Sequence, residues 1–243
     1  MSHRVLPELI RLCHLLGNPS QDLALYTEGD ASARLDAKSL LVKADGAQLG
    51  AMDETGLAQL AFEPLLELVA SHPNATPARI AQCLRDAAAP GSPMPCTEAF
   101  FHAVLLDLPG VLFVGHTHPA FVNAIMCSPK AEAFASLRLF PQQVRCCGPR
   151  SLYVPYMDPG LPLAVELRYR LELYQNEFGA PPATVLLGNH GMIALGASPE
   201  SVIMATTVMQ KAAHAYVLAQ SCGGAIPIPD PHAHRMLGIQ GGN

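Results

Sequence analysis

Two histidines stand one residue apart in VLFVGHTHPAFVNAI (residues 111–125), at the end of an apolar run and directly before a proline. In an extended strand, side chains at positions i and i+2 point to the same side of the backbone. His116 and His118 can therefore converge on one metal ion if the chain stays extended that far. Because a catalytic zinc site normally has three protein ligands and an open position, the pair alone does not define one. Two histidines at a solvent-wet strand end remain the alternative at this point.

A third histidine occurs in LLGNHGMIALG (residues 186–196), again where an apolar run breaks. His190 lies between Asn189 and Gly191, and the glycine allows a tight turn. The sequence thus offers a His-x-His pair plus one more histidine, all at predicted strand ends. That set is large enough for a catalytic metal site.

The segments around these stretches alternate between strand and helix periods, which predicts a mixed α/β domain. VLFVGH predicts a buried strand, with a helix beginning at Pro119, and residues 184–196 predict strand structure with a turn at 189–191. Earlier, residues 31–35 and 40–42 predict two strands joined by a turn near Asp36–Lys38. After the helix that begins at Pro119, a looser region runs to SLYVPYMDPG (residues 151–160). Helical spacing predicts six helices, over the first 16 residues and over residues 54–70, 76–88, 98–108, 161–178 and 198–221. Thr76 is the predicted N-cap of the third helix, and Thr97 directly precedes the fourth.

The length of 243 residues suits one α/β domain, which we place at residues 1–222. Residues 223–243 form a Gly/Pro-rich C-terminal tail that we expect to be extended or loosely packed. His232 and His234 in this tail copy the His-x-His spacing. Because they lie between prolines, we expect a solvated loop and no metal there.

Composition excludes several classes of protein. Half of the residues are hydrophobic, 14% are charged and the formal charge is −5, which argues against a disordered chain and against a nucleic-acid partner. No apolar run reaches the roughly 18 residues of a membrane span, and charged residues interrupt the N-terminal helix, so it is not a signal-peptide core. Seven cysteines without a CxxC pair suit free thiols in a reducing cytoplasm.

Six motifs in this order resemble the class II aldolase/adducin family, typified by fuculose- and rhamnulose-phosphate aldolases and ribulose-phosphate 4-epimerases. The motifs, which span nearly the whole chain, are GDASAR (29–34), KADG (43–46), EAFFH (98–102), GHTHP (115–119), VPYMDPG (154–160) and LGNHG (187–191). The resemblance implies a single-domain fold with a central, mostly antiparallel sheet flanked by helices. It also implies a cyclic homotetramer with active sites between subunits.

The resemblance further implies a bound divalent cation, usually Zn²⁺, on His116, His118 and His190, with Glu98 as the active-site glutamate. Its reaction is the making or breaking of a carbon–carbon bond next to a carbonyl. A divalent cation stabilises the enediolate of such a cleavage as a Lewis acid, and a buried carboxylate can move the proton. The alternative to a catalytic role is that Glu98 is an ordinary glutamate in the first turn of a helix, where the helix dipole favours a negative charge. We interpret His102 as a core histidine, or as one that supports the ligands from behind, rather than as a fourth ligand.

Departures from the family pattern concern the substrate. Phosphate-using members hold the phosphate with a Gly-Asn-x-Ser turn, a Ser/Thr-Gly turn and a Ser-Ser pair before the glutamate. At these positions the present sequence has two carboxylates, Asp30 and Asp45, which would repel a phosphate and so disfavour a sugar phosphate as substrate. The preference of aspartate for turns explains both residues equally well. Backbone and hydroxyl groups could still hold an uncharged substrate end. The substrate-binding residues predicted in this way are Gly29, Asp30, Ser32, Asp45, Gly46 and Thr97.

The predicted function is therefore that of a metal-dependent aldolase-type lyase acting on a small molecule, an unphosphorylated keto sugar or hydroxy-keto acid. Decarboxylase or epimerase variants of the same chemistry are alternatives, as is a non-catalytic assembly domain like the adducin head. A purely structural role for the zinc site is a weaker alternative, because structural sites usually have four protein ligands and only three good ones are visible here. Some members of the family it resembles use a C-terminal tyrosine of a neighbouring subunit as a proton donor. The tail here has no tyrosine, so the resemblance leaves this role to Tyr216, to another residue or to none.

Overall fold

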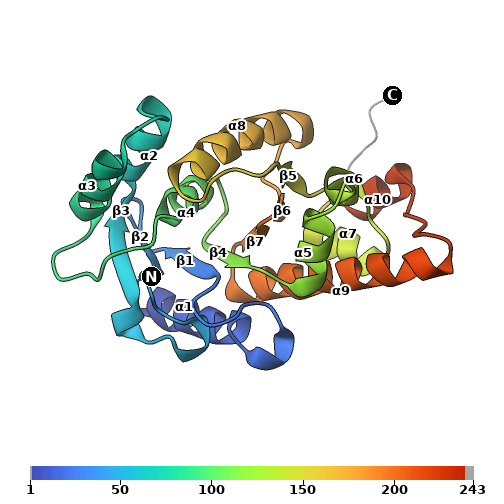
Figure 1. Cartoon of the computed structure of the whole chain (residues 1–243), viewed down its shortest axis with the longest axis horizontal. Coiled ribbons are helices and arrows are strands. Elements are labelled where there is room, and N and C mark those ends of the chain that lie inside the picture. Colours follow the sequence, from blue (N-terminus) through green and yellow to red (C-terminus); the bar gives the residue numbers. More distant parts are fainter. Residues whose placement is uncertain (1, 239–243) are drawn as a thin grey trace.

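A seven-stranded mixed sheet forms the centre of the computed structural model, which describes residues 2–238 (Figure 1). Its order is β3-β2-β1-β4-β7-β6-β5, and all neighbours are antiparallel except the parallel pair β5 and β6. The predicted α/β fold with a mostly antiparallel sheet is confirmed. The strands are β1 (Asp30–Arg34), β2 (Ser39–Lys43), β3 (Leu57–Ala61), β4 (Phe113–Thr117), β5 (Leu152–Val154), β6 (Thr184–Leu187) and β7 (Gly191–Gly196).

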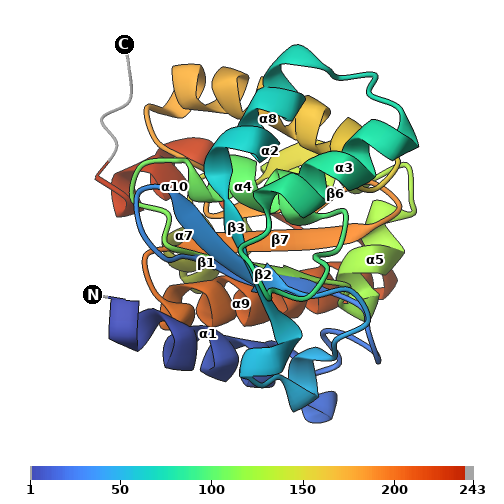
Figure 2. The ribbon, with the colours of Figure 1, turned by 90° about the vertical axis from the view of Figure 1, so that its left-hand side faces the viewer.

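Helices cover both faces of the sheet. Figures 1 and 2 show α1 and α9 beneath it and α2, α4 and α8 above it. The helices are α1 (Ser2–Leu16), α2 (Phe62–Ser71), α3 (Pro77–Ala87), α4 (Ala99–Leu106), α5 (Ala120–Met126), α6 (Ala131–Ser136), α7 (Pro141–Cys147), α8 (Leu161–Phe178), α9 (Pro199–Ala219) and α10 (Asp230–Met236). Within residues 2–238, no helix is both long and apolar enough to cross a membrane.

Side chains of the strands point alternately to the two faces of the sheet, and each face has its own hydrophobic core. Leu40 and Val42 of β2 belong to the core beneath α2, α4 and α8, whereas Leu41 between them belongs to the core that α1 and α9 share. Val114 and Phe113 of β4 divide in the same way. Because successive side chains of a strand point to opposite faces, a strand buried on both sides is apolar at nearly every position.

Several predicted elements are confirmed at close to their predicted bounds. The turn between β1 and β2 is closed by the Asp36 carboxylate, which accepts hydrogen bonds from the backbone N–H groups of Lys38 and Ser39. Thr76 caps α3 by accepting a hydrogen bond from the N–H of Arg79. All seven cysteines, which lie within the described residues, are free thiols, as expected.

Three predictions about local structure are wrong. Residues 57–61 form β3, not helix, because pairing with β2 overrides the helical preference of Leu-Ala-Gln-Leu-Ala. The looser region before β5 contains the short helices α6 and α7. The tail contains α10, which packs against α7 and buries Ala233, so residues 230–236 are neither extended nor a loop.

Candidate metal centre

Three histidines meet where β4 ends beside the turn between β6 and β7. His116 is the fourth residue of β4, His118 follows the strand by one residue, and His190 lies in the β6–β7 turn. Asn189 adopts a left-handed conformation in that turn, at φ 54°. A Cβ atom on Gly191 would lie 2.6 Å from the His118 ring and 2.5 Å from the Thr117 carbonyl oxygen. Only glycine therefore allows the turn to approach the end of β4 this closely.

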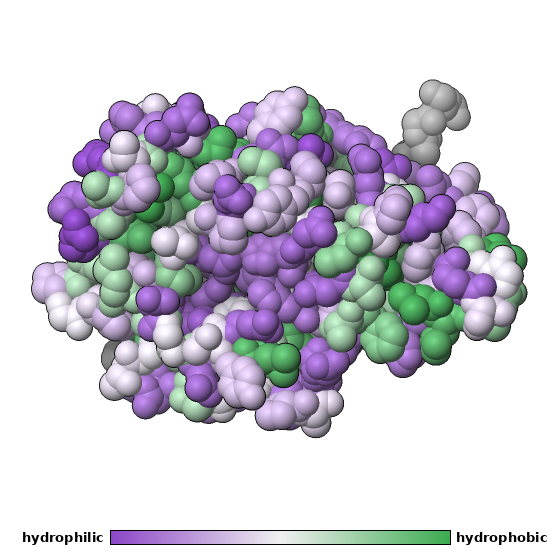
Figure 3. Space-filling model, in the orientation of Figure 1, coloured by the Kyte–Doolittle hydropathy of each residue, from purple (hydrophilic) through white to green (hydrophobic). Residues whose placement is uncertain are grey.

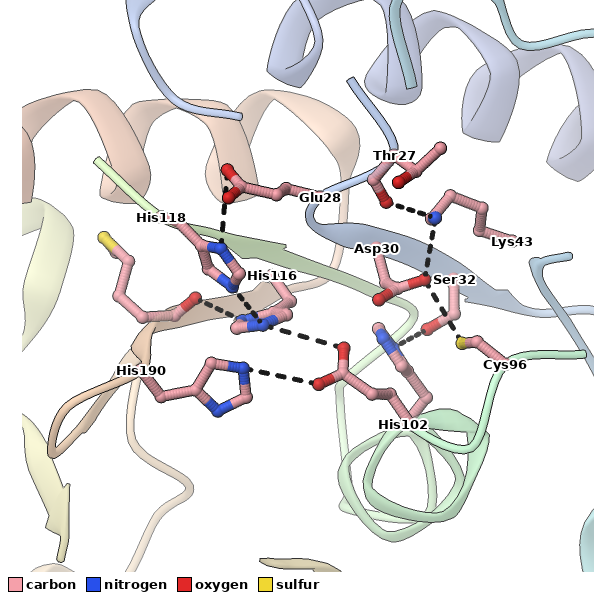
Figure 4. Close-up of polar contacts among 12 residues, drawn as sticks. Thr27, Glu28, Asp30, Ser32, Lys43, Cys96, His102, His116, His118 and His190 are labelled. Carbon is pink, nitrogen blue, oxygen red and sulfur yellow. Dashed lines mark hydrogen bonds and ion pairs between the residues drawn. The ribbon is translucent and has the colours of Figure 1, made fainter. Parts of the chain in front are cut away.

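Hydrogen bonding decides which ring nitrogens face the centre. His116 donates from Nδ1 to the backbone carbonyl of Met192 at 2.9 Å, because a carbonyl can only accept. His118 Nδ1 lies 3.6 Å from a carboxylate oxygen of Glu28, which favours the proton on that nitrogen. Both Nε2 atoms are then lone-pair donors, and they lie 2.9 Å apart (Figure 4).

The imidazoles are held in their neutral form. His116 is fully buried, and burial, followed by the neighbouring His190, lowers its pKa to about 4. Burial likewise lowers the pKa of His118 and His190 to about 4, with a neighbouring histidine as a further cause for each. Neutral imidazole is the form that binds metal, so these rings are ready to ligate at neutral pH.

This donor set fits a divalent cation. One ligand atom from each histidine lies within 4.8 Å of the others. Two imidazole nitrogens on a tetrahedral Zn²⁺ would be about 3.3 Å apart, close to the 2.9 Å between the two Nε2 atoms. Two lone pairs at that distance repel each other unless a cation lies between them. Fixing of the opposite ring nitrogen by a carbonyl or carboxylate is also the usual support of a histidine ligand.

Glu98, at the start of α4, approaches two of the three histidines with its carboxylate. It occupies the N-cap position of α4 without a capping hydrogen bond from its side chain, and its two carboxylate oxygens lie 3.6 Å from His116 Nε2 and 3.5 Å from His190 Nε2. The side chain is 13% exposed, and burial raises the pKa of its carboxyl group. A carboxyl group so placed can hold or release a proton next to whatever the histidines bind.

A buried ion pair lies behind Glu98. Lys43 donates to the carbonyl oxygens of Thr27 and Ala47, and its ammonium nitrogen is 3.6 Å from the Asp30 carboxylate (Figure 4). The Cys96 thiol donates to the same carboxylate at 3.2 Å. Burial, and next the adjacent Glu98, raises the pKa of Asp30. Of the two aspartates expected at the phosphate-binding positions, Asp30 is thus buried beside a cation, whereas Asp45 is exposed.

Of the remaining predicted substrate-binding residues, Gly29 and Ser32 are buried, whereas Asp45, Gly46 and Thr97 are exposed. Gly29 precedes β1 with φ 71°, and a Cβ atom there would lie 2.6 Å from the His116 carbonyl oxygen. Ser32 is fully buried, and its hydroxyl bonds to Nδ1 of the equally buried His102 at 2.6 Å. The interpretation of His102 as a core residue is confirmed.

Other candidates lie apart from the three histidines. His232 and His234 belong to α10, which packs on α7. Tyr216 of α9 packs edge-on against Phe134, with ring centroids 5.1 Å apart. In the space-filling view, the face that carries the end of β4 has a hydrophilic hollow near its middle (Figure 3).

Sequence reasoning missed two charged residues of this centre. Glu28 lies two residues before Asp30 and faces His118, and Lys43 opens the KADG motif. The position of Lys43 in the KADG motif could have marked it as a residue of the site. Glu28 gives no signal in the sequence, because only the path of the loop before β1 brings it to His118.

The fold and the three-histidine centre together define a mixed α/β protein built around a candidate site for one metal ion. The sequence profile described as "Class II Aldolase and Adducin N-terminal domain" matches residues 7–217, and the chain belongs to this family. Members are generally enzymes that act on small molecules, and they typically depend on a divalent metal. No curated protein matches the chain.

Solved structures with the same fold are only distantly related in sequence. YgbL from Escherichia coli is 19% identical, with 97% of this chain and 98% of that chain covered and a TM-score of 0.72. An L-fuculose 1-phosphate aldolase is 16% identical, with 97% and 95% covered and a TM-score of 0.72. The N-terminal class II aldolase domain of a Thermoplasma acidophilum protein is 21% identical, with 87% and 93% covered and a TM-score of 0.68. These likenesses show the fold alone.

Proposed function

We propose that this protein is a metal-dependent aldolase-type lyase that cleaves a carbon–carbon bond next to a carbonyl in an unphosphorylated keto sugar or hydroxy-keto acid. The observation that carries the proposal is the meeting of three neutral imidazoles with one largely buried carboxyl group, Glu98, between β4, α4 and the β6–β7 turn. A domain kept only for assembly has no need of this combination.

His116, His118 and His190 would hold the cation, for which Zn²⁺ suits the nitrogen ligands. When bound, such a cation supplies Lewis-acid stabilisation of negative charge on a carbonyl oxygen of the substrate. Met192 and Glu28 orient two of the rings through their Nδ1 atoms. That support fixes the tautomers before any ligand arrives.

Glu98 is the proposed proton-transfer group. Its raised pKa brings the carboxyl closer to the range in which it can both accept and return a proton near neutral pH. Gly29, Asp30, Asp45, Gly46 and Thr97 are the proposed substrate-binding residues. Ser32 contributes through its hydrogen bond to His102.

A homotetramer located in the cytoplasm is also proposed. The loop that delivers Glu28 exposes two apolar side chains, Leu25 at 58% and Tyr26 at 86%. Exposed apolar groups beside a site favour contact with another protein surface. Sedimentation equilibrium of the purified chain tests the tetramer, and a monomeric mass would contradict it.

The proposed reaction is tested with Zn²⁺-loaded protein on a panel of phosphorylated and unphosphorylated keto sugars and hydroxy-keto acids, with product analysis that separates cleavage from decarboxylation and epimerisation. Glu98→Gln keeps the shape but removes the proton acceptor, so turnover should fall by roughly 10²–10⁴ while metal content stays near one ion per chain. Glu63→Gln, on the exposed side of α2, is the matched control. Unchanged turnover in Glu98→Gln would remove Glu98 from the mechanism.

A further inference from the structure

A pocket of about 400 Å³ opens next to the residues that precede Glu98. Ile80 and Leu84 of α3 and Met94 supply apolar wall, Asp45 stands at its edge, and Cys96 and Thr97 join it to the site. We call this space the α3 pocket. Its volume lies within the roughly 300–1,000 Å³ of small-molecule sites.

Chain connectivity relates the α3 pocket to the three histidines. Thr97 lines the pocket, and the next residue, Glu98, reaches His116 and His190. Cys96 also lines the pocket, while its thiol donates to Asp30 behind Glu98. Because Thr97 and Glu98 are consecutive, the α3 pocket begins about one side-chain length beyond the Glu98 carboxylate, and a substrate held at the histidines would extend past Glu98 to reach it.

The charges around the pocket do not favour an anion. Among the described residues that line it, none is a lysine, arginine or histidine, and Asp45 is the only acidic one. The closest cation of the site, Lys43, is 3% exposed and already bonded to two carbonyl oxygens and paired with Asp30. A phosphate group placed here would meet Asp45 without gaining a free cation.

We propose that the α3 pocket receives the end of the substrate that is distal to the metal, and that this end is an uncharged alkyl or aryl group. The inference rests on the proposed function, since it concerns the substrate of the same site. Ile80, Leu84 and Met94 are its specificity-determining residues, because they supply the apolar wall that such a group would cover.

The test uses n-alkyl hydroxamates from acetohydroxamate to hexanohydroxamate, whose two oxygens chelate a divalent cation and whose tails lengthen by one methylene at a time. Affinity for the Zn²⁺-loaded protein, measured by calorimetry, should rise about fourfold for each added methylene. A counterpart with a phosphonate at the end of the tail should bind less tightly than the alkyl compound of equal length.

Two alanines of α3 provide a matched pair of variants. Ala81 lines the pocket, whereas Ala78 on the same helix is exposed and does not. Ala81→Trp should abolish the gain from tail length and leave acetohydroxamate affinity unchanged, and Ala78→Trp should preserve the gain. Because the chain has no tryptophan, Met94→Trp gives a single fluorophore at the pocket whose emission should shift with the long tail but not with acetohydroxamate.

The outcomes separate the two proposals. If acetohydroxamate does not bind the Zn²⁺-loaded protein, the proposed metal-dependent function fails. If acetohydroxamate binds but tail length has no effect, or Ala78→Trp and Ala81→Trp behave alike, the function survives and the α3 pocket is overturned. Absence of a tail effect would also result if a second copy of the chain filled the pocket, and that outcome equally contradicts the inference.

Discussion

At the scale of single residues, the candidate centre depends on what the outward-facing ring nitrogens bond to. The Met192 carbonyl and the Glu28 carboxylate fix the Nδ1 protons of His116 and His118. Their two Nε2 atoms then both carry lone pairs 2.9 Å apart, and neither has a proton to donate to the other. This is why the centre is better explained as a metal site than as a polar cluster.

The first prediction at this scale concerns metal content. His116→Ala, His118→Ala and His190→Ala should each reduce bound metal from about one ion per chain to well below one, as measured by elemental analysis. His232→Ala and His234→Ala, on α10, should leave it unchanged. Metal loss in the α10 variants with retention in the others would place the site elsewhere.

The second prediction concerns charge next to Glu98. Asp30→Asn combined with Asp45→Ser leaves the Lys43 cation without a counter-charge and removes the carboxylate at the edge of the α3 pocket. The affinity for a phosphonate-tailed hydroxamate relative to its alkyl counterpart should rise by about tenfold or more. Asp86→Asn, exposed on α3, is the control. An unchanged ratio would show that neither aspartate acts on the ligand.

At the scale of elements, α9 illustrates how local chemistry and burial cooperate. Ser198 and Ser201 form a reciprocal capping box at its N-terminus, and the 21-residue helix then packs on α1, α5, α7 and β7. The cap satisfies N–H groups that have no partner in the first turn. The helix lies beneath β4 and β7, so it supports the strands that carry His116 and the β6–β7 turn.

A prediction follows for this cap. Ser198→Ala should lower the free energy of unfolding by about 0.5–2 kcal/mol, measured by urea denaturation, whereas Ser198→Gly should cost only a few tenths. Metal content should not change in either variant, because the cap lies away from the three histidines. Equal and negligible losses in both variants would mean that the hydroxyl does not act as the cap.

At the scale of the whole molecule, the metal-free protein carries four buried or half-buried neutral histidines next to the sheet. The pKa of His116, His118 and His190 is lowered to about 4, and burial lowers the pKa of His102 well below its usual value. Their pKa in the unfolded chain is about 6.5. The unfolded state therefore binds more protons than the folded state in this pH range.

The metal-free protein should consequently lose stability as the pH falls from about 6.5 towards about 4, since stability rises with pH wherever the unfolded state binds more protons. Each such histidine contributes at most about 1.4 kcal/mol per pH unit. His102→Gln should reduce the slope by up to that amount, as seen in urea titrations at several pH values. A slope identical to wild type would show that His102 is protonated in the fold.

The sequence by itself determined the fold class and the three histidines. Apolar runs that end at His116 and at Asn189–His190, and the Asp36 turn between two short alternations, are local signals that the structure retains. Such signals persist because turn chemistry and the period-2 pattern depend on neighbouring residues only. The same locality made helix 161–178 predictable to the residue.

Only the tertiary structure decided the remaining features. β3 exists because β2 offers it a pairing edge, and α10 because it packs against α7 and buries Ala233. The pairing of Lys43 with Asp30, and of Glu28 with His118, joins residues whose side chains meet only after the sheet has formed. The charge of a site is the sum of groups that the fold gathers from distant positions, so a pattern read along the chain finds ligands more readily than it finds counter-charges.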